Sequence, residues 1–391
     1  MRPKKHIVFC ILGFALVINL AAQDKQNWAS DHLNVSGYVK FLNTSSFISL
    51  DSIANDNLIH NRTNMRLYAN DDFTLGLELR NRVFWGASVR SFPNFVQSVE
   101  NPNQDINLDA LLIHEPAILM LSTIDRLYVD YHKEKWQLVI GRQRINWGKN
   151  LVWNPNDLFN AYNFLDFDYE ERPGADALRA KYFTSGDSSF EFAISYAKVW
   201  RENTVAIKYN FNKHQYDFQL IAAKFLNDLT LGIGWEGVIK DVGFKGELSY
   251  FMPNDRSEGN NALVGSISFD YYFANDISIN ISTLYNSDGV GNVDFFGGSL
   301  MNNATIDAKN LMPNKWSLFG QFSKTFTPAI TGSMASIYAV DLNSVFLTPQ
   351  FTYNISQNWD FDVTGQIFYG KQEDEFRNLG NSIFLRFRYS F

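Results

Sequence analysis

The sequence predicts an all-β fold: a transmembrane, antiparallel, up-and-down β-barrel of about 18 strands with long extracellular loops. Three observations predict it. Short segments in which polar and apolar residues alternate recur along the chain. Aromatic residues make up 16% of the chain, as the aromatic belts of a membrane barrel require. After an N-terminal leader, no stretch reaches the roughly 20 consecutive apolar residues of a membrane-spanning helix.

Residues 1–22 are predicted to be a cleaved signal peptide. Basic residues at positions 2, 4 and 5 precede an apolar run from Ile7 to Leu20, and Ala21-Ala22-Gln23 follows as the cleavage site. The single cysteine of the chain, Cys10, lies inside this run. The mature chain is therefore expected to have no disulfide, no thiolate metal site and no cysteine nucleophile.

Alternation predicts eighteen strands in residues 23–391, which are expected to form one barrel domain. The clearest strands run over Phe73–Arg80, Val205–Phe211 and Ile277–Thr283, where one parity is apolar and the other is small or polar. The predicted strands lie near residues 33–42, 62–70, 73–84, 124–132, 135–146, 174–183, 189–198, 203–211, 215–224, 229–238, 241–251, 262–273, 276–286, 316–325, 329–340, 345–354, 358–370 and 379–391.

The predicted connections alternate in length, as expected of a barrel with short periplasmic turns and longer outer loops. Every even-numbered connection is short, for example Asp71-Asp72 and Ala274-Asn275. An even number of strands places both chain ends on the periplasmic side. The long connections all fall in the odd-numbered set, at residues 43–61, 85–123, 144–173, 252–261, 287–315 and 371–378.

The last predicted strand carries a motif of its own. From Ile383 to Phe391, every odd-numbered residue is apolar or aromatic, whereas the even-numbered residues include Arg386 and Arg388. A strand that ends on a terminal Phe, with aromatics two and four residues earlier, resembles the assembly signal of bacterial outer-membrane β-barrels. The resemblance implies location in the cell outer membrane, contact with its lipid and lipopolysaccharide, and recognition by the barrel assembly machinery through Phe391.

The polar face of the strands is predicted to line a wet lumen, because buried unpaired charges are costly and about 18 strands enclose an aqueous channel. Strand 18 adjoins strand 1 in a closed barrel, so the charges divide into two walls. The basic wall is predicted to carry Arg386, Arg388, Lys40, Arg66, Arg80, Arg82, Arg126, Arg179 and Lys181, against Glu78 and Asp130. The facing wall is predicted to carry Asp217, Glu247, Asp270, Asp360, Asp362 and Glu191, against Lys208 and Lys245.

Two interpretations of these charges remain open. Walls of opposite sign would produce a field across the lumen that favours small polar solutes. Alternatively, the charges pair with neighbours on adjacent strands and only keep the lumen wet.

The strand from Trp136 to Trp147 breaks its own alternation. The apolar parity of Leu138 and Ile140 leads directly to Arg142 and Arg144. Either a β-bulge near Gly141 switches the face or both arginines lie above the lipid. The glycine favours the bulge, so both arginines are predicted to turn inward.

The segment from Gly141 to Asp176 carries a second resemblance. Gly141-Arg-Gln-Arg-Ile-Asn-Trp-Gly148 is followed by Trp153-Asn-Pro-Asn-Asp-Leu-Phe159 and by Arg172-Pro-Gly-Ala-Asp176. This pattern resembles porin-like outer-membrane barrels of the alginate-export type and related uncharacterised barrels. The resemblance implies a loop that folds into the lumen and narrows it. The constriction residues that it implies are Arg142, Arg144, Asn154, Asp157, Asp176 and Arg179.

Two further loop segments have unusual composition. Asp166 to Glu171 holds four carboxylates, which could bind Ca²⁺, but without EF-hand spacing a solvated or arginine-paired acidic face is favoured. Leu108 to Leu121 is too apolar to extend into water. It is predicted to fold inward as a plug, with an interaction surface as the alternative.

The function predicted from the sequence is a porin-like channel for diffusion of small polar or charged solutes, with inward loops that form a constriction. The alternatives are a plugged barrel whose loops bind a partner or surface, and a specific transporter of a polymer or an apolar compound. No cofactor and no metal are implied, and a net charge of −7 disfavours nucleic acid. The histidines form no H-x-x-x-H pair, so no enzyme is expected. Assembly of the barrel as a homotrimer is left open.

Overall fold

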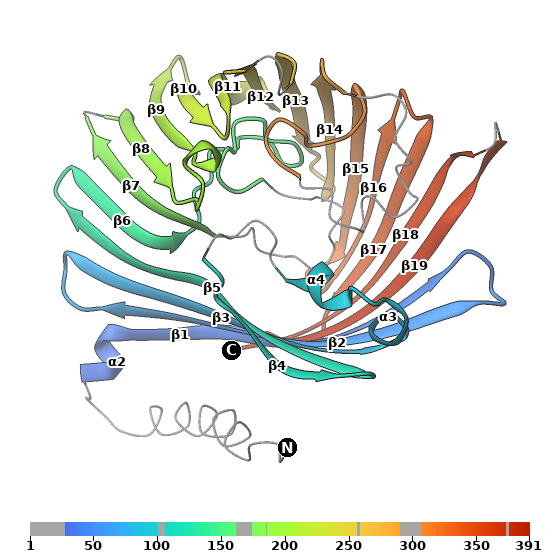
Figure 1. Cartoon of the computed structure of the whole chain (residues 1–391). Coiled ribbons are helices and arrows are strands. Elements are labelled where there is room, and N and C mark those ends of the chain that lie inside the picture. Colours follow the sequence, from blue (N-terminus) through green and yellow to red (C-terminus); the bar gives the residue numbers. More distant parts are fainter. Residues whose placement is uncertain are drawn as a thin grey trace.

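The structure is a computed structural model that describes residues 28–100, 106–161, 174–184, 186–255, 259–289, 306–372 and 375–391. In these residues a single antiparallel sheet of 19 strands closes on itself (Figure 1). The ring closes where β1 pairs with both β2 and β19. The predicted signal peptide and the acidic segment Asp166–Glu171 lie outside the described residues.

The elements follow one another as an up-and-down barrel. In the described part of the chain, four short helices accompany the strands: α2 (Trp28–His32), α3 (Ala87–Ser91), α4 (Phe95–Val99) and the 3-10 helix η1 (Trp200–Glu202). The strands are β1 (Leu33–Phe47), β2 (Ile53–Tyr68), β3 (Phe73–Gly86), β4 (Asp109–Glu115), β5 (Ile118–Lys133), β6 (Trp136–Gln143), β7 (Ala175–Phe183), β8 (Ser189–Ser195), β9 (Val205–Lys213), β10 (Tyr216–Phe225), β11 (Asp228–Ile239), β12 (Val242–Pro253), β13 (Ala262–Tyr272), β14 (Ile277–Asn286), β15 (Trp316–Thr327), β16 (Ile330–Ala339), β17 (Ser344–Asn354), β18 (Trp359–Gln372) and β19 (Glu375–Ser390).

Strand β4 does not add a position to the ring. One edge of β5 pairs with β3 along its length, whereas the other edge pairs with β4 over its first residues and with β6 over its last. β4 and β6 therefore share one edge of β5. The remaining eighteen strands close the barrel, which confirms the predicted strand number.

The strand faces follow the predicted parity. Ile383, Leu385 and Phe387 of β19 are 40–42% exposed on the outside, whereas the inward Arg386 is 8% exposed. The last residue closes the ring, because Phe391 and Gly37 exchange two backbone hydrogen bonds of 3.0 Å. Gly37 permits this approach, since a Cβ there would lie 2.9 Å from the Phe391 ring.

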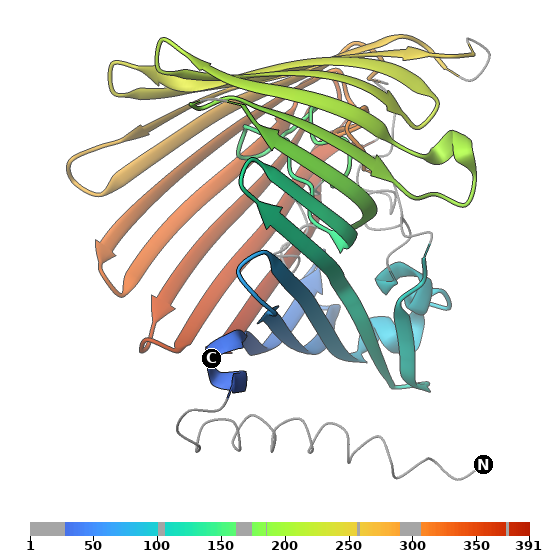
Figure 2. The same ribbon diagram turned by 90° about the vertical axis from the view of Figure 1, so that its left-hand side faces the viewer.

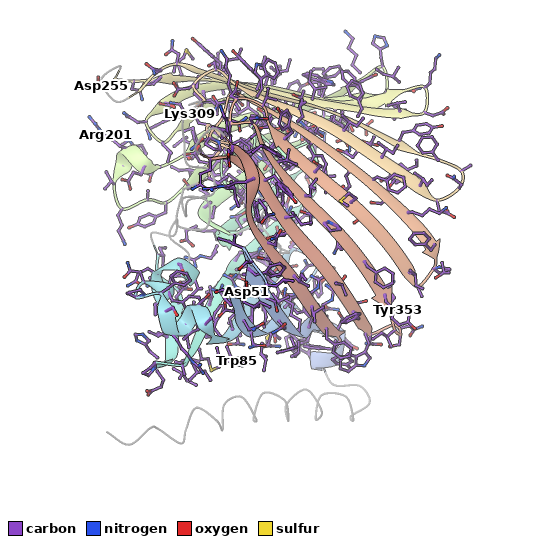
Figure 3. All side chains as sticks on the ribbon, turned by 90° about the vertical axis from the view of Figure 1, so that its right-hand side faces the viewer. Asp51, Trp85, Arg201, Asp255, Lys309 and Tyr353 are labelled. Atoms are coloured by element: carbon purple, nitrogen blue, oxygen red, sulfur yellow. The ribbon has the colours of Figure 1, made fainter. Side chains whose placement is uncertain are left out.

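The outside of the barrel matches a bilayer. The strands are strongly tilted relative to the axis of the barrel (Figure 2). Figure 3 shows Arg201, Asp255 and Lys309 at the end with the longer loops, and Tyr353 toward the end with the short turns. Rings of Phe190, Tyr209 and Phe211 stack near the short turns. A closed sheet satisfies its backbone groups internally, so an apolar exterior lets it span a membrane. No helix in the described part of the chain is long and apolar enough to cross one.

Two predicted loops are largely strand. β1 and β2 pair from Leu33↔Leu67 up to Phe47↔Ile53, so most of the predicted connection 43–61 continues the sheet. The predicted connection 371–378 likewise lies mostly in β18 and β19. Beyond the apolar band the outer face is polar too, so backbone pairing continues where the alternation that marks a strand is lost.

The apolar segment Leu108–Leu121 is not a plug, and that prediction is wrong. It forms the hairpin of β4 and β5, which lies in the barrel wall. Its apolar residues are divided between the two strands: Leu119, Met120 and Leu121 of β5 are buried, whereas Leu111 and Ile113 of β4 are exposed. The element inside the barrel from this connection is instead α4 (Figure 1).

Candidate functional site: the lumen and its inward loop

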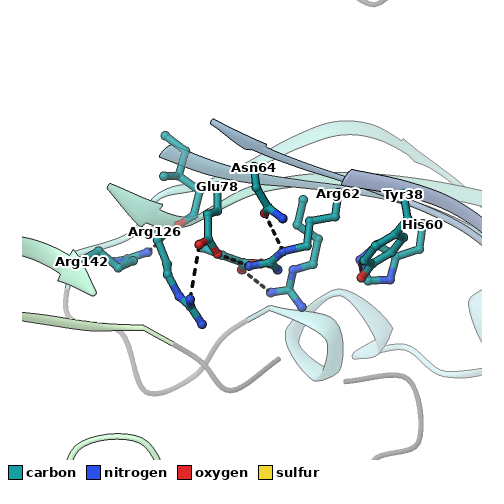
Figure 4. A network of polar contacts seen from close by, with 10 residues as sticks. Tyr38, His60, Arg62, Asn64, Glu78, Arg126 and Arg142 are labelled. Atoms are coloured by element: carbon teal, nitrogen blue, oxygen red, sulfur yellow. Dashed lines mark hydrogen bonds and ion pairs between the residues drawn. The ribbon is translucent and has the colours of Figure 1, made fainter. Parts of the chain in front are cut away.

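A network of charged side chains lines the lumen on β2, β3 and β5 (Figure 4). Arg62 bridges Glu78 and Asp125, with 2.5 Å between its Nη1 and Asp125 Oδ2. Arg80 lies 2.9 Å from Asp125, and Arg126 lies 3.3 Å from Glu78. Among the described residues, three guanidinium groups thus share two carboxylates.

The network contains two residues that sequence reasoning missed. Arg62 is the first residue of the predicted strand 62–70 and has the same parity as Arg66, so the alternation already indicated an inward side chain. Asp125 has no such signal. Arg126 lies opposite Glu78 and Ile124 lies opposite Leu79, so Asp125 is an extra bulged residue that turns inward beside Arg126.

Four further pairs of lumen charges form across adjacent strands. The pairs are Arg386–Asp362 at 2.9 Å, Arg388–Asp360 at 2.7 Å, Lys208–Glu191 at 3.4 Å and Lys245–Glu236 at 2.8 Å. Asp360 and Asp362, predicted on the acidic wall, therefore neutralise arginines predicted on the basic wall. Pairing of neighbours, the second interpretation, describes these residues better than two walls of single sign.

Several predicted lumen residues remain toward the end with the short turns. Arg66 and Asp217 are exposed, and Arg179 and Asp270 are half-buried on inward positions of β7 and β13. A cavity of about 400 Å³ at this end is bordered by Asp217, Lys181 and Lys149. The lumen is thus polar and accessible below the loops described next.

Arg142 and Asp176 lie in the wall rather than in the lumen. Gly141 has a φ of 117°, but β6 pairs with β5 and β7 in unbroken register through this glycine, so the predicted β-bulge is not present and Arg142 keeps the parity of Ile140. Arg142 then donates two hydrogen bonds to Asp176, of 2.9 and 2.8 Å, and one of 3.2 Å to the Ile124 carbonyl. The buried pair joins β5, β6 and β7 where β6 ends, so it seals a junction of strands.

The predicted inward loop is present in residues 144–161, named here the inward loop. It lies against β8–β13, on the side of the barrel that faces β1–β3 (Figure 1). Glu247 of β12 holds it: the buried carboxylate accepts backbone N–H bonds from Lys149, Asn150 (3.1 Å) and Asn156 (2.9 Å). Hydrogen bonds from a rigid strand to loop backbone fix the path of the loop.

Polar side chains of neighbouring strands complete this seat. Gln219 donates to the Trp147 carbonyl (2.8 Å), Ser249 to the Pro155 carbonyl (3.0 Å) and Ser266 to the Trp153 carbonyl (2.9 Å). The loop approaches the strand backbone closely at Gly232, where an added Cβ would lie 2.7 Å from Asn156 Oδ1.

Apolar contacts fasten the same loop. Its buried residues pack against buried apolar residues of the strands and of the connection before β15; the group includes Ile145, Trp147, Val152, Trp153, Leu158, Ile221, Phe225, Phe251, Val264, Leu311 and Phe319. Trp147 also donates to Glu191 at 2.8 Å and lies beneath Lys208, whose Nζ is 4.8 Å from the ring centroid. The loop is therefore a packed part of the barrel.

The predicted constriction residues of this loop have different places. Asn154 and Asp157 are buried and accept hydrogen bonds from the loop backbone, from Asn150 (3.0 Å) and Trp147 (3.4 Å) respectively. They shape the loop rather than line the lumen. Arg144 is exposed at the start of the loop.

From the facing side, α4 extends into the lumen, and Arg82 donates a 2.6 Å hydrogen bond to the Val99 carbonyl at its end. The inward loop and α4 thus lie on opposite walls of the barrel. Within the described residues, no group of three His, Cys, Asp or Glu side chains is arranged to hold a metal ion.

Solved structures share this architecture. Pseudomonas aeruginosa OpdQ aligns with a TM-score of 0.56 at 9% identity, over 92% of this chain and 98% of that chain. Acinetobacter baumannii OccAB4 gives 0.55 at 8% identity, over 92% and 99%. The outer membrane protein opdK from P. aeruginosa gives 0.55 at 10% identity, over 92% and 98%.

This chain has the fold of those barrels. Identities near 10% show a shared fold and leave the solute undetermined. No protein-family profile matches the chain. No curated protein matches it either. The resemblance to the alginate-export type stays a prediction.

Proposed function

We propose that this protein is an outer-membrane channel through which small polar or charged solutes diffuse, and that the inward loop sets its narrowest section. The observation that carries the proposal is the inward loop itself. It is fastened to one wall through Glu247, whereas charged residues of β2, β3 and β5 lie on the facing wall. A barrel built only as an anchor needs neither a charged interior nor a seat for a loop.

Several features support a diffusion channel. Arg66, Lys181 and Asp217 line the accessible end of the lumen and carry charges of both signs. Eighteen strands belong to the size class that encloses water. The outer-membrane location is supported by the fold and by the terminal Phe391, which would bring lipid, lipopolysaccharide and the barrel assembly machinery as partners. We propose no catalytic role.

The test is swelling of liposomes that contain the purified protein, with a size series of neutral sugars and small amino acids. Rates that fall steeply with solute size support a narrowed channel. Liposomes that contain folded protein but do not swell with any solute would contradict the proposal. They would support the plugged barrel, which the burial of Lys40 and Arg80 inside the lumen favours.

The alginate-export kinship is a finer proposal with its own test. If segment 141–176 indicates that substrate class, oligomers of uronic acid should block the current through single channels in a concentration-dependent way. Neutral oligosaccharides of the same length serve as the control.

A further inference from the structure

The outer face of β2, β3 and β5 carries a row of polar side chains. Ser122 donates a 2.7 Å hydrogen bond to Asn81, Asn81 donates a 3.1 Å bond to Asn61, and Asn61 donates a 3.1 Å bond to the Tyr38 carbonyl. All three residues are paired in register. Their inward neighbours Arg62 and Arg80 belong to the lumen network, so the row faces away from the lumen.

The row lies at a height where lipid is expected. Asn81 stands on β3 between the outward Leu79 and Val83, with Phe73 at the end with short turns and Trp85 beyond it toward the long loops. Phe73 pairs with Tyr131 and Trp85 stacks on Phe41, so both belong to aromatic pairs. Aromatic rings mark the two interfaces of a membrane barrel, so Asn81 lies within the apolar band.

Other parts of the barrel show what lipid selects at this height. The outward positions midway along β8–β15 are apolar and 38–58% exposed; they include Phe192, Ile207, Leu220, Ile233, Leu248, Ile267, Ile281 and Leu318. Each carboxamide of the row has donor and acceptor capacity beyond these hydrogen bonds. Polar groups that face hydrocarbon with capacity left over are costly, so this sector does not match lipid.

Above the band the mismatch is reversed. The tip of the β1–β2 hairpin, which extends past the membrane in the same sector, exposes Ile48 (74%) and Leu50 (76%). Phe92, after α3, is 60% exposed. The sector is therefore polar where lipid would be and apolar where water would be. Contact with another protein would give the polar side chains hydrogen-bond partners within the membrane and would cover the apolar side chains above it.

We propose that the outer face of β1, β2, β3 and β5 is an interface with a second copy of this chain. Copies in one membrane share one orientation, and a symmetry axis along the membrane normal brings equal heights together. The carboxamides then meet carboxamides, which donate and accept and so complement themselves. The apolar hairpin tips meet each other above the membrane. A partner of different sequence has no such built-in match of heights.

Single cysteines test the interface in the membrane of the expressing bacterium, because the mature chain is expected to have none. Asn81→Cys should cross-link with a short bis-maleimide to a species of twice the protomer mass. Ile281→Cys, outward on β14, is the matched control and should stay at protomer mass. A cross-linked species of any other mass, or none at Asn81, would overturn the proposal.

A second measurement uses the apolar double variant Asn61→Leu/Asn81→Leu, which gives this sector the side chains found elsewhere on the band. Native mass spectrometry should show the unaltered protein as an oligomer and the variant mostly as single barrels. An unaltered protein that is monomeric when extracted in a mild detergent would contradict the interface. If the variant does not fold, the cysteine result alone decides.

Discussion

At the scale of single residues, burial separates the charged side chains that stabilise the fold from those that are accessible to solute in the lumen. Arg142 and Glu247 are 2% and 1% exposed, and both form hydrogen bonds with other groups of the protein. Arg66 and Asp217 are exposed in the lumen. The sequence shows parity, and parity separates inside from outside. It does not show whether an inward charge is covered by a loop, because that depends on contacts far away in the chain.

Removing one partner of the Arg142–Asp176 pair should destabilise the barrel strongly. Arg142→Ala leaves a buried carboxylate without its cation, and the loss is expected to be about 3–5 kcal/mol. Urea unfolding in lipid vesicles measures it. The exposed pair Lys133–Asp72, with 3.6 Å between its charged atoms, is the control, and Lys133→Ala should cost less than about 1 kcal/mol. Equal losses in both variants would contradict the assigned role.

Glu247→Ala should release the inward loop, because three backbone N–H groups lose their acceptor. Trypsin then cleaves after Arg144 or Lys149 at a rate well above that of the unaltered protein. Glu247→Gln keeps one carbonyl oxygen and should give an intermediate rate. Ser317→Ala, buried outside the seat, is the control for general loosening. A protected loop in Glu247→Ala would show that the apolar contacts alone hold it.

At the scale of elements, alternation predicts a strand only where lipid lies on one side and water on the other. It therefore finds the strand parts within the membrane and misses the outer half of β2 and the outer ends of β1, β18 and β19. It also misreads the β4–β5 hairpin, whose apolar residues could equally belong to a plug. Sequence reasoning did predict that the connection after β6 turns inward, but it did so from a resemblance and not from physical pattern.

Replacing residues 147–157 with a short Gly-Ser linker should leave the barrel folded, because β6 and β7 pair through residues outside this stretch. The conductance should rise by a factor of two or more as the constriction is lost. Resistance of the folded barrel to SDS at room temperature checks the fold. An unchanged conductance in a folded variant would mean that the inward loop does not set the narrowest section.

At the scale of the whole molecule, eighteen strands form a ring, the outside is apolar and the inside carries charge. These properties follow from strand number, parity and the net absence of long apolar runs, so the sequence predicts them. The distribution of charge along the pore does not follow in the same way. It depends on which residues pair across strands, and bulges such as the one at Asp125 change that pairing.

Ion selectivity should respond to the accessible charges in opposite directions. Arg66→Ala removes a positive charge from the lumen and should shift the reversal potential in a salt gradient toward cation selectivity. Asp217→Asn removes a negative charge and should shift it toward anion selectivity. Asp241→Asn, at the exposed turn between β11 and β12, is the control. Shifts of the same sign in both lumen variants would contradict the assignment.

The most direct test of the account is the current through single barrels in a planar bilayer. A water-filled lumen narrowed by a fixed loop predicts stable steps of uniform size, smaller than those of the variant without residues 147–157. Folded barrels that insert into the bilayer and carry no current would contradict the channel.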